Sequence, residues 1–366
     1  MDQWAQRYGR KNADNTRRLK PNTYRFVAQF WQDVVISSPP VITHPGARQQ
    51  DAIDLMFPSL VAASRNVVRD IVRYGCGVFT NDTAYRPGSL DPRFYYPVAR
   101  PERGEYMGAI AAVPFTEGAT ANVADRLAVT QYQQGSAKAS KTVYALNGQT
   151  VGAVKESFDD AILAHPVLIT WGEGEFGESW YSDIEEYVID LHRRESLVSE
   201  ALDRHTNPHL AVHEATFKVG TDGKVTVAQD GMILPIPDGA DVAPQYVTWD
   251  AEFGAQETAM DRAVERIQRF TAIAPVLTQH RQDGHEFNVP SGSALRRLSL
   301  VTVQRINTVR EALTVGMRTA LAENMITAAG AGLEAPTLDA DKIKIEWPLP
   351  LFAAEDDDEE PGDVND

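Results

Sequence analysis

Five stretches of the chain repeat apolar residues every three or four positions, the spacing that gathers them on one face of a helix. The five predicted helices cover residues 21–38, 51–74, 182–205, 256–274 and 293–328. At about 1.5 Å per residue, the last would reach roughly 50 Å. A helix of that length contributes little to a small globule, so the pattern indicates a subunit of a large protein assembly.

Between the second and third helices the apolar pattern shortens into β-type runs such as FYYPVA, YMGAIAAVPF and KTVYALNG. Gly, Pro, Asn and Asp separate these runs. They predict a modest mixed or antiparallel sheet packed on the two early helices. A second, compact β region follows Pro208, where the Asp222-Gly223 turn predicts a hairpin. Helices combined with separate β regions define an α+β fold.

The sequence also predicts where several of these helices begin and end. Ser182 and Glu185 match a capping box, which places the start of the third helix at Ser182. Pro275 is expected to end the fourth helix, and Pro290 precedes the fifth. The polar loop between them is not expected to be buried, because its backbone and side chains would lack hydrogen-bond partners in a core. We expect it to be either a plain surface connector or a segment that contacts a partner.

The chain has 366 residues with a formal net charge of −16 and a pI of about 5.0. This excess of acidic residues argues against a protein that binds nucleic acid tightly, because tight binding comes from Lys and Arg that neutralise phosphates. DNA could still pass along such a protein. No apolar run is long enough to cross a bilayer, and the polar N-terminus does not predict a secretory signal. Cys76 is alone, so no intrachain disulfide or multi-cysteine metal site is expected.

Charge is concentrated at the two ends of the chain. Residues 1–20 carry six Lys or Arg against two Asp. Such an arm either contacts nucleic acid or a neighbouring subunit, or is a solvated leading helix. Residues 355–366 hold eight acidic residues in twelve, which predicts a disordered tail.

One motif is suggestive of a dinucleotide site. Gly172, Gly174 and Gly177 fit the pattern G-x-G-x-x-G after an apolar strand. The intervening glutamates would repel a pyrophosphate, and the predicted helix starts too late for the third glycine to pack it against the strand. We therefore interpret the motif as an acidic turn, and keep a nucleotide-binding enzyme as the alternative.

Histidines 205, 209 and 213 are spaced four apart, but Pro208 interrupts any helix that would align them on a metal. The sequence contains neither a G-x-S-x-G elbow nor a Walker A loop. We therefore predict a protein that is not an enzyme and that uses no cofactor or metal.

Four stretches together resemble the portal proteins of tailed bacteriophages. The first is an early helix that ends in a Pro-containing turn, NTYRFVAQFWQDVVISSPPVI. The second is a helix that leads into a strand, ASRNVVRDIVRYGCGVF followed by LDPRFYYPV. The third and fourth resemble the start of a stem helix and of the long helix beside the tunnel, GESWYSDIEEYVIDLHRRE and VPSGSALRRLSLVTVQRI.

The resemblance implies a ring, expected to contain twelve copies, at the unique capsid vertex through which viral DNA is packaged and ejected. It implies a division of the chain into a wing, a stem helix, a clip, a second stem helix, a tunnel loop, a long helix, a strand returning to the wing, and the acidic tail. In this sequence these parts are 1–178, 179–205, 206–255, 256–274, 275–292, 293–330, 331–354 and 355–366. The helical crown that portals often carry is not expected here, because the C-terminal residues predict only a strand and an acidic tail.

The resemblance also implies site residues and partners. In the tunnel loop, the side chains expected to face DNA are Gln279, His280, Arg281, Gln282, Asp283, His285 and Glu286. In the clip, those expected to dock the terminase large subunit and the head–tail adaptor are Phe217, Lys218, Asp222 and Lys224. Further copies of the chain, the major capsid or scaffold protein and passing double-stranded DNA complete the expected partners, without a membrane. The protein would be assembled in the host cytoplasm and reside in the virion, and another head–tail structural protein is the nearest alternative.

Overall fold

A computed structural model describes most of the chain. The described residues are 22–81, 86–99, 106–115, 124–133, 138–147, 150–173, 176–206, 209–213, 233–236, 245–247, 254–277 and 292–350. The chain divides into two compact units, which are treated separately below. Unit 1 comprises Met1–Thr23 and Ile184–Gln268, and unit 2 comprises Tyr24–Asp183 and Arg269–Asp366. Both helices and sheets are present, so the expected α+β class is confirmed.

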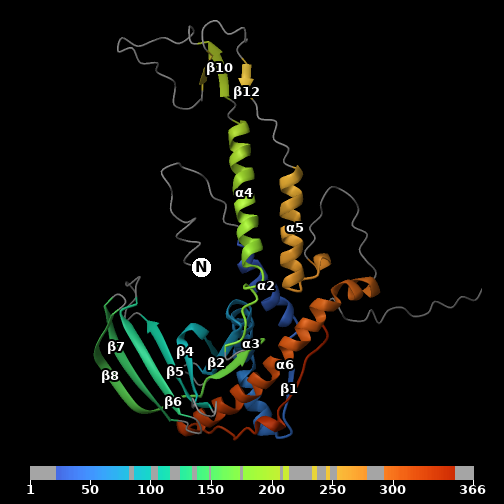
Figure 1. Cartoon of the computed structure of the whole chain (residues 1–366). Helices are drawn as coiled ribbons and strands as arrows, with labels where there is room; N and C mark the ends of the chain where they lie inside the picture. Colours follow the sequence, from blue (N-terminus) through green and yellow to red (C-terminus); the bar gives the residue numbers. More distant parts are fainter. Residues whose placement is uncertain are drawn as a thin grey trace, which may run out of the picture. The chain divides into compact units, whose positions relative to one another are not determined.

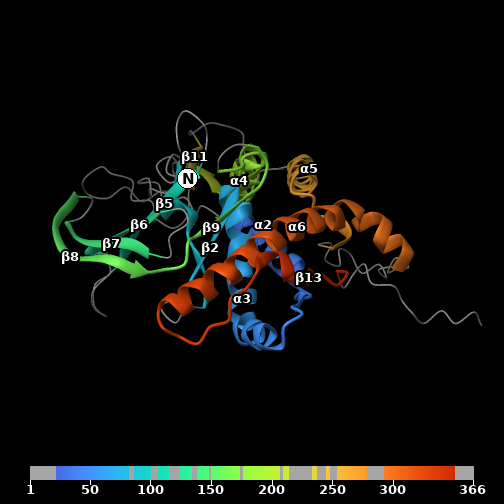
Figure 2. The ribbon, with the colours of Figure 1, turned by 90° about the horizontal axis from the view of Figure 1, so that it is seen from below.

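Three helices form the core of unit 2. They are α2 (Thr23–Val35, whose first residue belongs to unit 1), α3 (Ala47–Tyr74) and α6 (Gly292–Gly330). α6 contacts α3 and runs across it in Figure 2. Their buried faces carry the apolar residues that the helical periodicity predicted, and Trp31, Leu60, Ile71, Leu313 and Met317 are at most 1% exposed. Each such side chain stabilises the fold by roughly 1.5–3 kcal/mol through burial.

Two separate sheets replace the single sheet expected between the second and third helices. The three-stranded sheet has the order β3-β2-β9, from β3 (Pro87–Leu90), β2 (Cys76–Asn81) and β9 (Val167–Thr170). Its strands are antiparallel, and α3 packs on β2 and β3. The expectation of one sheet was wrong because the 3-10 turn η1 (Pro92–Phe94) interrupts the strand order between β3 and β4.

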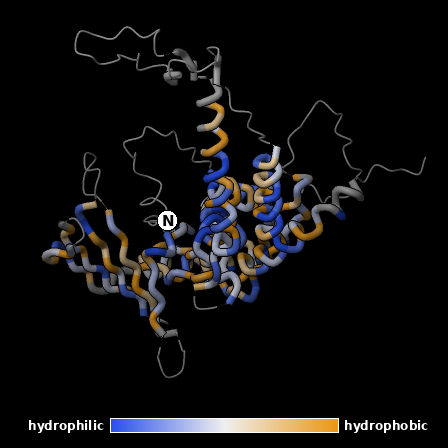
Figure 3. Tube along the Cα trace, turned by 45° about the horizontal axis from the view of Figure 1, so that its top comes forward, coloured by the Kyte–Doolittle hydropathy of each residue, from blue (hydrophilic) through white to orange (hydrophobic). Residues whose placement is uncertain are grey.

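The second sheet of unit 2 has five antiparallel strands in sequence order (Figure 1). They are β4 (Tyr95–Ala99), β5 (Tyr106–Phe115), β6 (Arg126–Gln133), β7 (Lys138–Asn147) and β8 (Thr150–Ile162). Hydrophobic and hydrophilic residues mix along these strands in Figure 3. The edge strand β8 leaves Val151, Val154 and Phe158 about half exposed.

The C-terminal part of unit 2 returns to its beginning. β13 (Lys344–Glu346) pairs antiparallel with β1 (Val41–Thr43), and Ile42 lies opposite Ile345. Two short 3-10 turns complete the unit, η3 (Pro275–Leu277) and η4 (Ala340–Lys342).

The described residues of unit 1 form two helices separated in sequence by a small sheet. α4 is Glu185–Thr206 and α5 is Gly254–Phe270, of which the last two residues belong to unit 2. The sheet has the order β11-β10-β12, from β10 (His209–His213), β11 (Ile233–Ile236) and β12 (Gln245–Val247). β10 is parallel to β11 and antiparallel to β12. The hairpin predicted around Asp222 lies outside the described residues.

The predicted start of the third helix was wrong. Ser182 does not begin it, because its hydroxyl donates to the Ser179 carbonyl at 2.6 Å. The residues from Tyr181 to Ile184 form turns, and α4 starts at Glu185. The Ser182 hydroxyl thus bonds within the turn that precedes α4, and the helix starts three residues after Ser182.

Candidate functional site

The residues assigned to the tunnel loop and clip lie outside the described part of the chain. This holds for Gln279, His280, Arg281, Gln282, Asp283, His285 and Glu286, and for Phe217, Lys218, Asp222 and Lys224. The structure does describe the elements that flank these segments: α4 and β10 before the clip, α5 after it, and η3 and α6 on the two sides of the loop.

The segment that leads into the loop is fixed in the core of unit 2. Thr302 of α6 donates its hydroxyl to the Ala272 carbonyl at 2.7 Å and accepts from the Ala274 amide at 3.0 Å. The Trp31 indole donates to the Thr271 carbonyl at 3.2 Å. These bonds hold Ala272 at φ 55°, a left-handed conformation that a non-glycine residue rarely adopts. α5 consequently ends at Phe270, before the Pro275 that the sequence suggested.

The glycine turn serves close backbone packing. The Trp171 amide donates to the Gly75 carbonyl, and the Glu178 amide donates to the Trp171 carbonyl, each at 2.7 Å. A Cβ on Gly177 would lie 2.3 Å from the Gly75 carbonyl oxygen, and Gly177 itself has φ +67°. Gly172 also has a positive φ, while Gly174 lies outside the described residues. Gly177 is thus explained by the approach of the turn to the end of α3, and Gly172 by its positive φ.

An arginine between two tryptophans joins this region to α6. The Arg305 guanidinium lies 4.7 Å from the Trp180 ring centroid and 5.6 Å from that of Trp171. Trp180 in turn packs edge-on against Trp31 at 4.9 Å. Burial lowers the pKa of Arg305, although Asp183 opposes that shift. The cluster is a cation–π arrangement that anchors the segment before α4 to the long helix.

A second arginine of α6 is buried without a carboxylate partner among the described residues. Arg310 is 2% exposed and donates to the carbonyls of Val35, at 3.1 Å, and of Pro348, at 2.6 Å. Its guanidinium also lies 5.0 Å from the Trp347 ring centroid. Burial lowers the pKa of Arg310 to about 10. Arg310 therefore connects α6 to the end of α2 and to the segment after β13.

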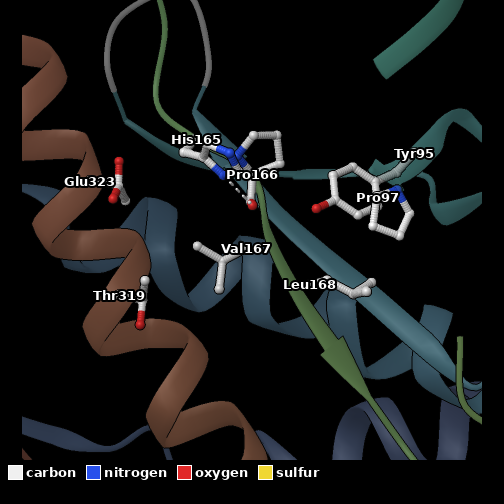
Figure 4. A pocket seen from close by; sticks show the side chains of 8 residues that line it. All are labelled: Tyr95, Pro97, His165, Pro166, Val167, Leu168, Thr319 and Glu323. Atoms are coloured by element: carbon white, nitrogen blue, oxygen red, sulfur yellow. Dashed lines mark hydrogen bonds between the residues drawn. The ribbon is translucent and has the colours of Figure 1, made fainter. Parts of the chain in front are cut away.

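A pocket of about 300 Å³ lies in unit 2 beside α6 (Figure 4). α6 supplies Thr319 and Glu323, and β4 supplies Tyr95 and Pro97. His165, Pro166, Val167 and Leu168 complete the lining, which is mostly apolar. The His165 ring packs 5.7 Å from that of Tyr132, whose pKa burial raises to about 12. No local pattern in the sequence predicts this pocket, because its walls come from three distant segments.

The described part of the chain contains no group of three metal-ligating side chains that could hold an ion. Within the same residues, no helix combines the length and apolarity that crossing a membrane requires.

The sequence reasoning missed the charge pattern of α5. Acidic residues recur every four positions at Glu257, Asp261 and Glu265, and arginines recur at the same interval at Arg262 and Arg266. All five side chains are exposed. The four-residue repetition of charge sign was visible in the sequence and is the signal that could have found this surface.

Comparison with known proteins gives no family and no close relative. No family model matches the chain, and no curated protein matches it. Among solved structures it is similar to a chain in the virion of a native gene transfer agent particle, with 12% identity and a TM-score of 0.49 over 90% of this chain and 81% of that one.

Two further chains come from necks of such particles. One is from the neck of the native particle computed with C12 symmetry, at 11% identity, and the other from the neck of the empty particle computed with C6 symmetry, at 13%. Both have a TM-score of 0.49 and cover 90% of this chain, and 81% and 82% of their own lengths. Likeness at this level does not assign a function.

Proposed function

We propose that the chain is a structural subunit of a phage-like virion head or neck, and specifically a portal-type subunit that assembles into a ring around passing double-stranded DNA. In this proposal α4 and α5 form the channel wall, the sheet between them belongs to the clip, and unit 2 corresponds to the wing and the long helix.

The observation that carries the proposal is the exposure of α5. This helix of 17 residues buries only Ala263 and Ile267. On α4, Leu197 and Leu202 are about half exposed. Helices in water owe most of their stability to packing of an apolar face rather than to propensity. Long helices that bury so little of their surface within one chain are suited to a channel wall in which neighbouring copies of the chain cover the rest.

The order of elements in unit 1 supports the same proposal. The chain runs through α4, then β10, β11 and β12, and then returns through α5. β10 is the central strand of the small sheet, so β11 and β12 are its edges. Sheet edges can pair with strands of another chain, which suits a contact with terminase or an adaptor.

The ring can be tested on the purified full chain. Native mass spectrometry is expected to show a closed oligomer near twelve copies, and negative-stain images should show a ring with a central opening. A stable monomer at high concentration would exclude a portal. A closed ring of clearly different size would favour another head–tail structural protein.

We further propose that the chain acts without enzymatic activity. The rival, a nucleotide-binding enzyme that uses the turn at Gly172 and Gly177, predicts a rise in melting temperature when nucleotide is added, because a ligand that binds only the folded state stabilises it. Titration with ATP and NAD, with inorganic phosphate as the control anion, separates the two. No shift beyond that of phosphate is expected.

A further inference from the structure

Over residues 257–266, α5 sorts its exposed charges by sign into two stripes, and the exposed Arg269 follows Glu265 by four positions at the end of the helix. The acidic stripe is Glu257, Asp261 and Glu265, and the basic stripe is Arg262 and Arg266. Residues four apart lie one above the other on a helix, so each stripe runs along the helix axis. Successive residues turn by roughly 100°, which places the centres of the two stripes about 120° apart.

The contacts of α5 with α4 orient the stripes. Gln256 accepts from Arg194 of α4 at 3.0 Å, and the Arg266 guanidinium lies 5.4 Å from the ring centroid of Tyr187 of α4. The basic stripe therefore borders the side of α5 that contacts α4. The acidic stripe lies on the far side of α5 from Gln256. One copy of the helix pair consequently presents opposite charges on different sides.

Neither stripe is neutralised within the described part of the chain. None of its ion pairs includes Glu257, Asp261, Glu265, Arg262 or Arg266. Like charges four apart destabilise a helix by roughly 0.2–0.5 kcal/mol per pair. α4 uses the opposite arrangement, because Asp190 and Arg194 form an i,i+4 ion pair at 2.7 Å. The like-charge rows of α5 are thus unfavourable in the isolated chain, although Arg262 and Arg269 lie three and four positions from Glu265, and an oppositely charged surface would stabilise them.

A second copy of the chain is the partner that satisfies both stripes. A partner of one sign, including DNA, would match one stripe and repel the other. A copy placed head to tail sets its basic stripe against the acidic stripe of its neighbour and leaves its own acidic stripe for the next copy. Such a heterologous contact closes into a ring when the rotation between copies closes.

We propose that the acidic stripe of α5 in one copy contacts the basic stripe of α5 in the next, and that this contact sets the direction of the ring. The inference rests on the proposed ring, to which it adds the residues and the polarity of one subunit contact.

Charge reversal tests the contact. The first variant carries Asp261→Arg and Glu265→Arg, and the second carries Arg262→Glu and Arg266→Glu. Each alone is expected to lose rings in native mass spectra at low salt, by at least tenfold. An equimolar mixture of the two should form rings in which they alternate. The variant with all four substitutions keeps the net charge of the chain. It reverses the sign of the charge at the substituted positions of both stripes, so it should form rings on its own.

Folding is followed by circular dichroism. A third variant, Arg262→Glu alone, keeps the Arg266–Tyr187 contact and should weaken assembly without loss of helix. All defects should shrink between 0.1 M and 1 M salt, because the Debye length falls from about 10 Å to about 3 Å. Folded double variants that form rings as well as the native chain would overturn the stripe contact but not the proposed ring. A folded fourfold variant that does not assemble would have the same consequence. A native chain that forms no ring would overturn both.

Discussion

Two helices of this chain, α6 and α5, show how differently similar sequence patterns can be used. α6 buries its apolar residues inside unit 2, where Ile306, Leu313 and Met317 are fully buried. α5 has an equally regular apolar repeat, yet Val264 is 39% exposed and Phe270 44%. Amphipathicity therefore predicts that a helix has a face to bury but does not say whose surface will cover it. Unit 2 has its own core, whereas α5 of unit 1 buries only Ala263 and Ile267, and we propose that a neighbouring copy covers the rest.

The largest expected difference between the two helices lies in truncation of their apolar residues. Leu313→Ala in α6 should lower the free energy of unfolding by about 2–5 kcal/mol, because it removes buried methyl groups and leaves a cavity. Val264→Ala in α5 truncates a partly exposed apolar residue instead and should cost roughly 0.5 kcal/mol or less in the unassembled chain. Urea unfolding at a concentration too low for assembly measures both. Equal losses would contradict the comparison.

The next effect concerns the buried cation of α6. Arg310→Ala should destabilise unit 2 by about 2–3 kcal/mol, because the Val35 and Pro348 carbonyls each lose a hydrogen bond from a charged donor. Arg310→Met retains bulk against Trp347 and should recover only part of the loss. Arg297, an exposed arginine of the same helix, is the control, and Arg297→Ala should be nearly neutral. If Arg310→Met were as stable as the native chain, the bonds to the two carbonyls would contribute little.

A buried acid near the end of α3 should make unit 2 sensitive to pH. Asp70 is 4% exposed, and burial raises its pKa from 3.8 to about 6, although Arg69 opposes the shift. The folded chain then holds this proton more tightly than the unfolded chain. The contribution of Asp70 to stability is greatest below its unfolded pKa of 3.8 and falls by about 3 kcal/mol as the pH rises toward 6.

Asp70→Asn removes that dependence. The variant should be more stable than the native chain by about 1–3 kcal/mol at pH 7.5 and by almost nothing at pH 3.5. Asp33→Asn, on the exposed side of α2, is the control and should show no such difference. Urea unfolding at the two pH values measures the effect. A gain of the same size at both would mean that the side chain, rather than its charge, is unfavourable.

The sequence predicted elements well where local periodicity decides them and poorly where distant residues do. The five helices follow from their apolar repeats. The division of the strands into two sheets does not, because β2 pairs with β9, which comes after the whole five-stranded sheet. The end of α5 at Phe270 depends on hydrogen bonds between Thr302 and the turn that follows, one donated to the Ala272 carbonyl and one accepted from the Ala274 amide. Such bonds leave no pattern near Pro275.

The residues of the candidate site likewise divide into those that a local pattern predicts and those that depend on distant parts of the chain. The need for glycine at Gly177 comes from the Gly75 carbonyl, on a different element, and could not be read from the G-x-G-x-x-G pattern. The side chains assigned to the tunnel loop and clip, such as Arg281 and Lys224, lie outside the described residues and stay predictions. The charge stripes of α5 were readable, since they need only the four-residue spacing of a helix.

The smallest expected effect is the one that separates the two helices most sharply. Asp261→Asn removes the middle charge of the acidic stripe and leaves helix propensity nearly unchanged. In the unassembled chain it relieves repulsion from Glu257 and Glu265, so the melting temperature should rise slightly, by an amount that corresponds to a few tenths of a kcal/mol and disappears at high salt. The same substitution should weaken ring assembly, because the next copy loses a partner for its arginines.

Glu311→Gln on the exposed side of α6 is the control and should leave assembly unchanged. A residue of α6 that stabilises its own unit has no reason to show opposite effects on folding and assembly, whereas a residue kept for contact with a neighbour should. If Asp261→Asn changed thermal stability and assembly in the same direction, the stripe would belong to the fold of the single chain, and α5 would be an ordinary exposed helix.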